Sequence, residues 1–225
     1  KNDTFAGIKA NCEEGYGIAA VNGTGCCVAG IDEIGETLQI GGLGAITNDK
    51  GGSRNMVLTA LNLIYNQQLR SGEETLLTVN FASALETDEK NIIQKGFFAF
   101  EQGNLQYIKD MSIAVYKSAN EGDAAAISIL KEIGDEYARC IDAVYEGLNF
   151  TSPKIPVALI GTQFVKCENK TVIERIFEKL EESAIDYDVR ISDVKPVAGA
   201  VIWAAERAGV SDEQRKLIRS KMSEL

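Results

Sequence analysis

The chain has 225 residues, of which 45% are hydrophobic and 25% charged, as in an ordinary globular protein of one large or two small domains. Its 33 acidic and 23 basic residues give a formal charge of −10, which argues against nucleic acid or an anionic membrane as a partner, because both require a cationic face. No apolar run approaches the roughly 20 residues that span a bilayer, and a start at Lys1 without a signal peptide predicts a piece of a longer protein.

The N-terminal part of the chain predicts one helix followed by three strands. Asp3 opens the helix, and the strands cover Tyr16–Gly23, Cys26–Ile31 and Glu36–Gly42. Only two residues separate the first two strands, which is typical of a tight hairpin. The third strand continues the antiparallel run.

The middle of the chain predicts helices alone. A helical pattern follows residues 51–53, and residues 73–119 have the pattern of several short helices. A clearer helix comes next, because apolar residues recur at spacings of three and four between Leu130 and Leu148. Asp123 stands where the N-cap of that helix is expected.

The last part of the chain alternates strands and helices. The predicted elements are, in order, an apolar strand over 154–161, a helix over 172–180, a strand over 187–192, a helix over 197–209 and a final helix from residue 211. In the final helix Ser211 and Gln214 have the spacing of a capping box. Three antiparallel strands followed by β-α-β units predict a mixed sheet with helices on both faces.

The triplet Gly23, Thr24 and Gly25 lies between the first two strands, where backbone N–H groups can point outward beside a hydroxyl. Such converging donors suit a phosphate because no side chain blocks its approach. The alternative interpretation is an ordinary hairpin turn, in which glycine is common.

A second glycine cluster, GGLGAITNDKGGS over residues 41–53, comes just before the next helix. The N-terminus of a helix favours anions. Asp49 in this cluster either contributes to a site or caps the helix. Lys50 could contact a phosphate, although a solvated lysine is the simpler interpretation.

Three further positions stand at the ends of elements. Gly161 and Thr162 follow a buried strand, and ligands of open α/β sheets collect at the carboxyl ends of strands. Asp3 opens the first helix, where an N-cap role is the simple interpretation.

The chain contains no histidine, so acid–base chemistry must come from a carboxylate, a tyrosine, a lysine or a thiol. Histidine triads and histidine-bound zinc are therefore excluded within this chain. The cysteines are odd in number and form no C-x-x-C pair, which disfavours a disulfide framework or a metal site and indicates a reducing cytoplasm. They are Cys12, Cys26, Cys27, Cys140 and Cys167.

Taken together, these segments resemble a known family. In chain order, NDTFAGIKA, GYGIAAVNGTG, GGLGAITNDKGG, EGDAAAISIL, VALIGTQF and VAGAVIWAA are similar to the second lobe of the BadF/BadG/BcrA/BcrD ATPase family. Within that family the chain is most similar to the N-acetylglucosamine kinases, which belong to the superfamily of sugar kinases, heat-shock protein 70 and actin. The resemblance covers essentially the whole chain.

The resemblance implies an α/β, ribonuclease H-like lobe over residues 1–225, with a mixed five-stranded sheet, helices on both faces and a helical insertion at 73–119. It implies that ATP, Mg²⁺ and a sugar meet in a cleft between this lobe and an N-terminal lobe of the same protein. The activity implied is ATP-dependent phosphorylation of an amino sugar or related hexose in the cytoplasm.

The resemblance also assigns roles by position. Asp3 matches the carboxylate that takes the proton from the sugar hydroxyl attacking the γ-phosphate. The remaining assignments are Gly23, Thr24 and Gly25 to the phosphates, Gly161 and Thr162 to adenosine, and Gly42, Leu43, Gly44 and Asp49 to the sugar.

The sugar loop departs from the family's usual G-G-W-G-x-x-x-G-D-E-G-S, because Leu43 replaces Trp, Asn48 replaces Gly and Lys50 replaces an acid. Two other functions stay open. One is an ATPase that drives electron transfer to a dehydratase or reductase through a cysteine-bound iron–sulfur cluster at a dimer interface. The other is a non-catalytic sugar sensor. The stretch 73–119 and the apolar terminal helices offer a surface for a homodimer.

Overall fold

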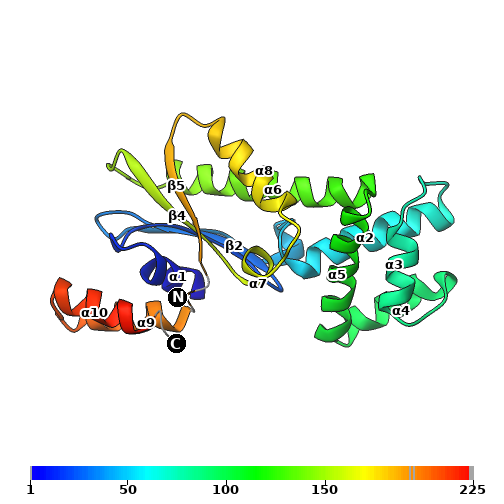
Figure 1. Cartoon of the computed structure of the whole chain (residues 1–225), viewed down its shortest axis with the longest axis horizontal. Coiled ribbons are helices and arrows are strands. Elements are labelled where there is room, and N and C mark those ends of the chain that lie inside the picture. Colours follow the sequence, from blue (N-terminus) through cyan, green and yellow to red (C-terminus); the bar gives the residue numbers. More distant parts are fainter. Residues whose placement is uncertain (1, 193, 195, 223–225) are drawn as a thin grey trace.

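The computed structural model describes residues 2–192, 194 and 196–222. Its centre is a five-stranded mixed sheet in the order β3-β2-β1-β4-β5 (Figure 1). The strands are β1 Gly17–Asn22, β2 Cys26–Ile31, β3 Thr37–Gly41, β4 Lys154–Ile160 and β5 Asp186–Ile191. The mixed sheet expected from the sequence is confirmed, with strand ends that differ by at most one residue.

The antiparallel and parallel parts of the sheet meet at β1. This strand pairs antiparallel with β2 and parallel with β4, so that Ala20 stands opposite Val28 on one side and Leu159 on the other. The outer strands β3 and β5 extend the antiparallel and the parallel part respectively. Because β1 and β4 run parallel as neighbours, their carboxyl ends lie side by side, and the turns that follow them are brought together.

Helices cover both faces of the sheet, as predicted. On one face α6 (Ala124–Glu146) crosses β1, β2 and β3, and α8 (Thr171–Glu181) packs beside it. These elements share one core with α2 (Gly52–Leu69), which begins at the sheet and runs away from it (Figure 1). The apolar runs of the central strands are explained by this double cover.

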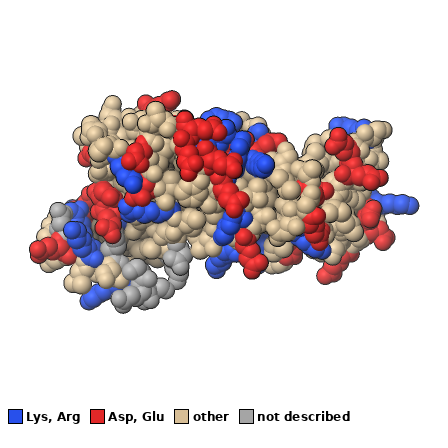
Figure 2. Space-filling view, turned by 45° about the horizontal axis from the view of Figure 1, so that its top comes forward, with Lys and Arg blue, Asp and Glu red and all other residues tan. Residues whose placement is uncertain are grey.

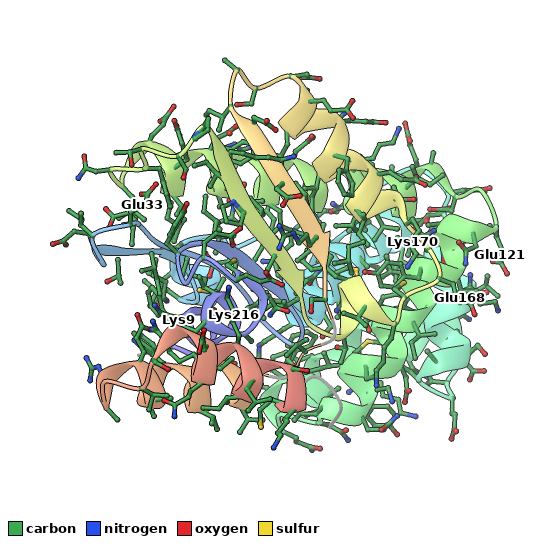
Figure 3. All side chains as sticks on the ribbon, turned by 60° about the vertical axis from the view of Figure 1, so that its left-hand side comes forward. Lys9, Glu33, Glu121, Glu168, Lys170 and Lys216 are labelled. Atoms are coloured by element: carbon green, nitrogen blue, oxygen red, sulfur yellow. The ribbon has the colours of Figure 1, made fainter. Side chains whose placement is uncertain are left out.

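The other face is covered by α1 (Asp3–Asn11) and α9 (Pro196–Arg207), with α10 (Asp212–Met222) packed on α9. The buried Lys9 of α1 forms an ion pair of 2.8 Å with Glu206 of α9. Figure 3 shows Lys9 close to Lys216 of α10, and both line one small polar cavity. Trp203 of α9 is partly buried and packs against the core beneath.

The capping box at the start of α10 is confirmed. The Gln214 side-chain oxygen accepts a hydrogen bond from the Ser211 N–H at 3.3 Å, and the Ser211 hydroxyl accepts one from the Gln214 N–H at 3.4 Å. Two orphan donors at the helix start are thereby satisfied within four residues.

Residues 73–119 form a helical arm that extends from the sheet along α2 (Figure 1). The arm consists of α3 (Leu77–Ala84), a 3₁₀ turn over Glu89–Asn91, α4 (Ile92–Glu101) and α5 (Leu105–Asn120).

Asp123 attaches the arm to the next helix. Its carboxylate accepts a hydrogen bond from the Ala126 N–H at 2.8 Å, which is the predicted N-cap of α6. The same carboxylate accepts the Leu76 N–H at 2.7 Å, just before α3 begins. One side chain therefore starts α6 and fixes the entry to the arm.

Charges of both signs are mixed on the surface. Figure 2 shows basic groups among the acidic ones, and carboxylates crowd the region where α8 lies. Ion pairs between residues three apart on this helix, such as Lys179 with Glu182 at 2.7 Å, lie on its exposed face. Among the described residues, no helix combines the length and apolar character required to cross a bilayer.

Gly199 determines how closely α9 approaches α1. A Cβ at this position would overlap the carbonyl oxygen of Ala6, so Gly199→Ala forces the two helices apart. We expect the free energy of unfolding to fall by about 1–3 kcal/mol, as at other overpacked sites, in urea unfolding followed by circular dichroism. Ala200→Ser, on the exposed side of α9, is the control and changes stability by less than about 0.5 kcal/mol. Equal stabilities for both variants would contradict this packing.

Candidate functional site

The turn between β1 and β2 is held by the first residues of α2. The N–H of Ser53 donates to the carbonyl oxygen of Gly23 at 2.9 Å, and the N–H of Arg54 donates to that of Thr24 at 3.1 Å. The first N–H groups of a helix have no acceptor within the helix. Here the carbonyl groups of the turn are their acceptors. The start of α2 therefore binds the turn rather than an anion, which corrects the expectation from the sequence.

These bonds decide where the N–H groups of the turn itself point. A trans peptide group is planar, with its C=O and N–H on opposite sides, and no cis peptide occurs in the described chain. Because the carbonyl groups of Gly23 and Thr24 face α2, the N–H groups of Thr24 and Gly25 point away from it. Neither N–H has an acceptor among the described residues. The turn thus presents two adjacent donors, the arrangement that binds anions in a backbone nest.

Glycines occur around this turn for two different reasons. Gly52 has φ of +80°, and a Cβ there would lie 2.6 Å from the carbonyl carbon of Gly25, so glycine lets α2 approach the turn. At Gly23 and Gly25 a Cβ would meet nothing within 4 Å, and neither has a positive φ. The fold itself does not require glycine at these two positions. Their bare surface leaves room for a ligand against the two donors.

Two side chains that the sequence analysis did not identify secure the turn. Asn22, which is 1% exposed, accepts the N–H of Gly52 at 3.0 Å. The amide of Gln163 donates to the Gly23 carbonyl at 3.1 Å and accepts from the Tyr116 hydroxyl at 2.7 Å. Asn22 could have been noticed as a polar residue ending an apolar strand. Gln163 carries no local signal, because its partners are far away in the chain.

Gly161 and Thr162 lie where β4 ends beside the same turn. Gly161 has φ of +105°, and a Cβ there would lie 2.5 Å from the carbonyl oxygen of Asn22, so only glycine allows the two chains to pass this closely. Thr162 begins α7 (Thr162–Val165), a short helix that was not predicted. The structure therefore brings this strand end next to the turn at Gly23.

Asp49 organises the loop over residues 42–49. One of its carboxylate oxygens accepts the N–H groups of Gly42 at 2.9 Å, Leu43 at 3.0 Å and Gly44 at 2.7 Å. The alternative that Asp49 caps α2 is wrong, because the N-cap is Gly51 and no side chain bonds there. A buried carboxylate that gathers three N–H groups fixes the path of the loop.

The unusual residues of this loop have structural explanations. Asn48 has φ of +53°, a left-handed conformation that glycine adopts freely and asparagine tolerates. Lys50 forms an ion pair of 3.1 Å with Glu132 of α6. Leu43 is 64% exposed at the tip of the loop. The conformation of Asn48, the ion pair of Lys50 and the exposure of Leu43 are thus all compatible with the path of this loop.

Asp3 is the first residue of α1 but not its cap. The side chain of Asn2 accepts the N–H of Thr4 at 3.1 Å, so Asn2 is the N-cap and the N-cap interpretation of Asp3 is wrong. The Asp3 side chain is exposed. A Cβ at Gly42 would lie 3.8 Å from the amide nitrogen of Asn2, so the start of α1 adjoins the loop over residues 42–49.

The cysteine pair of β2 lies between these segments. Burial, followed by the Asp49 carboxylate, raises the pKa of the Cys26 thiol to about 12. Burial also raises the pKa of Cys27, a hydrogen bond with Thr4 lowers it, and Asp3 and Asp49 both raise it. Both thiols are therefore neutral at pH 7 and act as small apolar groups.

Two cavities flank the turn. The larger cavity, of about 610 Å³, is lined by Gly23, Thr24, Ser53, Thr162, Gln163, Lys166, Cys167 and the α5 residues Leu105, Gln106, Ile108, Lys109, Ser112, Ile113 and Tyr116. The smaller cavity, of about 210 Å³, is lined by Thr24, Gly25, Cys26, Gly42, Gly44, Asp49, Gly51, Arg54, Asn55 and Leu58. Thr24 lines both. Asp3, Leu43 and Gly161 lie outside these two linings.

Metal-binding side chains do not cluster in the described part of the chain, where no group of three or more Cys, Asp or Glu residues is arranged to hold an ion. The site is instead made of backbone N–H groups, glycine surfaces and single carboxylates. Such a site can position and neutralise a phosphate without a protein-bound metal centre.

A model of the BadF/BadG/BcrA/BcrD ATPase family matches residues 1–204. The chain belongs to this family. The resemblance drawn from the sequence motifs is thereby confirmed over most of the chain. No curated protein matches the chain.

Solved structures share the fold of this family member. The structure named "Putative N-acetylglucosamine Kinase" from Chromobacterium violaceum has a TM-score of 0.63 and 17% sequence identity, and the match covers 89% of this chain. The structure of the same name from Porphyromonas gingivalis has a TM-score of 0.59 and 17% sequence identity, and the match covers 91% of this chain. A ROK family glucokinase from Streptomyces griseus, in complex with glucose and AMPPNP, has a TM-score of 0.55 and 12% sequence identity, and the match covers 89% of this chain. The chain spans 63–65% of the length of these proteins. The chain therefore has a fold found in sugar kinases.

The carboxylate of Asp49 is expected to hold the loop over residues 42–49 in place. Asp49→Asn keeps the size of the side chain but removes its charge, which weakens the bonds of this buried side chain to three backbone N–H groups and lowers the free energy of unfolding by about 1–3 kcal/mol. Hydrogen exchange at residues 42–44 should accelerate at least tenfold. Asp88→Asn, at an exposed position without a capping bond, is the matched control. Unchanged exchange in Asp49→Asn would contradict this role.

Proposed function

We propose that this chain is the second lobe of an ATP-dependent sugar kinase whose first lobe belongs to the same protein. The observation that carries the proposal is the pair of outward N–H groups at Thr24 and Gly25, set between the larger and the smaller cavity. A phosphoryl group on these donors would border both cavities, as transfer between two bound molecules requires. Membership of an ATPase family and the sugar kinase fold support this proposal.

In this proposal ATP occupies the larger cavity. Adenosine lies against the turn at Gly161 and Thr162, and the phosphates extend to Thr24. Lys109 and Lys166 line the cavity and add positive charge. Gln163 keeps the Gly23 carbonyl turned away from the phosphates, which would otherwise be repelled by its oxygen.

When bound with ATP, Mg²⁺ would neutralise part of the phosphate charge. Such an ion keeps water ligands and needs few protein carboxylates. The carboxylate of Asp49 lines the smaller cavity, but both of its oxygens are bonded within the loop, so the ion would be held chiefly by ATP and water.

The sugar occupies the smaller cavity, where Gly42, Gly44 and Asp49 form one wall. The oxygens of Asp49 are already used by the loop, so this residue contributes to sugar binding by shaping the backbone. Leu43 presents an apolar side chain at the loop tip. Such a surface suits the less polar face of a sugar ring.

Asp3 takes the proton from the sugar hydroxyl as it attacks the γ-phosphate. The chain has no histidine, and Asp3 is an exposed carboxylate that begins a helix next to the loop over residues 42–49. A positioned carboxylate suffices as general base because the protein's main task in phosphoryl transfer is to position groups and neutralise charge.

Gly25→Ala tests the phosphate turn without disturbing the fold. The new methyl group meets nothing within 4 Å and requires no positive φ, so the unfolding temperature should not fall. In the complex the methyl group would crowd a phosphate held by the adjacent N–H groups. We expect at least tenfold weaker ATP binding by isothermal titration calorimetry. Unchanged affinity would show that the turn does not hold the phosphates.

The kinase activity itself is tested by ADP release from the full-length protein with Mg²⁺-ATP and a panel of hexoses and amino sugars, including N-acetylglucosamine. We expect turnover that depends on one class of sugar. Asp3→Asn should lower kcat by about 10²–10⁴-fold, the range for loss of a general base, while ATP affinity stays the same. Asp88→Asn is again the control.

Two outcomes would contradict these assignments. ATP hydrolysis that no sugar stimulates would argue against a kinase and favour an activator ATPase. Sugar-dependent turnover that survives Asp3→Asn nearly unchanged would keep the kinase and remove Asp3 as its base.

A further inference from the structure

We infer that the sugar accepted by this protein carries an anionic group, which Arg54 binds. The inference rests on the proposed function, because it concerns the occupant of the proposed sugar cavity. Arg54 lies in the first turn of α2 and lines the smaller cavity together with Gly25, Gly42 and Asp49. Its side chain is exposed and therefore accessible to a ligand.

Contacts on two sides fix the position of Arg54. Its backbone N–H donates to the Thr24 carbonyl at 3.1 Å, in the bond that holds the phosphate turn. The centre of its guanidinium group lies 5.1 Å from the ring centroid of Phe100 in α4. Contact with an aromatic ring orients a guanidinium group and leaves its N–H donors available to an anion. Arg54 is thus held in place before any ligand arrives.

Within the described part of the chain, no carboxylate forms an ion pair with Arg54, whereas Arg139, Arg175 and Arg190 each pair with an acidic side chain. Arg54 therefore lines the smaller cavity as a cation without an acidic partner among these residues. In a partly enclosed cavity such a charge favours a bound anion.

The other charged side chain of the smaller cavity, Asp49, does not offset this preference. One Asp49 oxygen accepts three backbone N–H groups, and the other accepts the Thr47 hydroxyl at 2.6 Å. Its charge is thus directed into the loop. Cys26, which also lines the cavity, is a neutral thiol because burial raises its pKa to about 12. Arg54 therefore supplies the charge that a ligand would meet.

The chemistry of a guanidinium group defines the class of substrate. Its planar fork binds a carboxylate or a phosphoester through two parallel hydrogen bonds. A sugar with a free ammonium group would be repelled from the same position. We therefore expect sugar acids or sugar phosphates to be preferred over the neutral hexose, and a free amino sugar such as glucosamine to be the poorest substrate.

The test compares D-glucuronate, glucose 6-phosphate, D-glucose and glucosamine with the full-length protein. ADP release with Mg²⁺-ATP gives kcat and KM for each sugar, and calorimetry without ATP gives the affinity of each sugar directly. Glucuronate and glucose 6-phosphate distinguish a carboxylate from a phosphoester as the anion. We expect one of them to bind at least tenfold more tightly than glucose.

Arg54→Gln should raise the Kd and KM of the preferred anionic sugar at least tenfold and leave those of glucose unchanged. Arg70→Gln is the matched control, because Arg70 lies at the far end of α2 and also contacts an aromatic ring, Tyr65, at 4.8 Å. Arg70 lines neither cavity, so Arg70→Gln should change neither the Kd nor the KM of any of these sugars. The unfolding temperature of both variants shows whether α2 is intact.

The possible results separate this inference from the kinase proposal. Arg54-dependent binding of an anionic sugar without turnover would keep the inference and reject the kinase activity. Turnover in which Arg54→Gln lowers kcat equally for every sugar would show that Arg54 acts on the transferred phosphoryl group and overturn the inference. Preference for glucose, or affinities that Arg54→Gln does not change, would overturn it as well.

Discussion

The site depends on the hydrogen bonds between the start of α2 and the hairpin turn. Ser53 and Arg54 need acceptors for N–H groups that no helix can satisfy internally, and the carbonyl groups of Gly23 and Thr24 provide them. Because peptide groups are planar, the same bonds turn two N–H groups outward. Because the first N–H groups of α2 need acceptors, two N–H groups of the turn are left facing outward. The bonds between α2 and the turn fix the turn in its position between the two cavities.

Much of the fold was predictable because its signals are local. Buried parallel strands are apolar throughout, as in β4, and helix starts carry recognisable caps such as Asp123. Roles that depend on distant partners were not predictable. Asp49 was expected either in a site or as a helix cap; it does not cap the helix, and it lines the smaller cavity while it gathers the N–H groups of its own loop. Gln163 joins residues of two other elements, and no sequence spacing encodes that contact.

In the loop over residues 42–49, the residues that fix the backbone path are different from those that present exposed side chains. Asp49 and the left-handed Asn48 maintain the path of the chain. Leu43 and Lys50 are not needed for that path, since one is exposed and the other pairs with Glu132. Substitutions at these two positions could therefore alter what the loop contacts without altering its backbone.

The contact of Tyr116 with Gln163 joins the helical arm to the strand end beside the turn. It makes α5 one wall of the larger cavity, whereas the turn at Gly23 joins two strands of the sheet. The two ends of that cavity are therefore built from different parts of the fold. If ATP binds as proposed, substitutions in the arm would reshape the wall formed by α5 and leave the turn unchanged. Nucleotide preference could then change separately from phosphate binding.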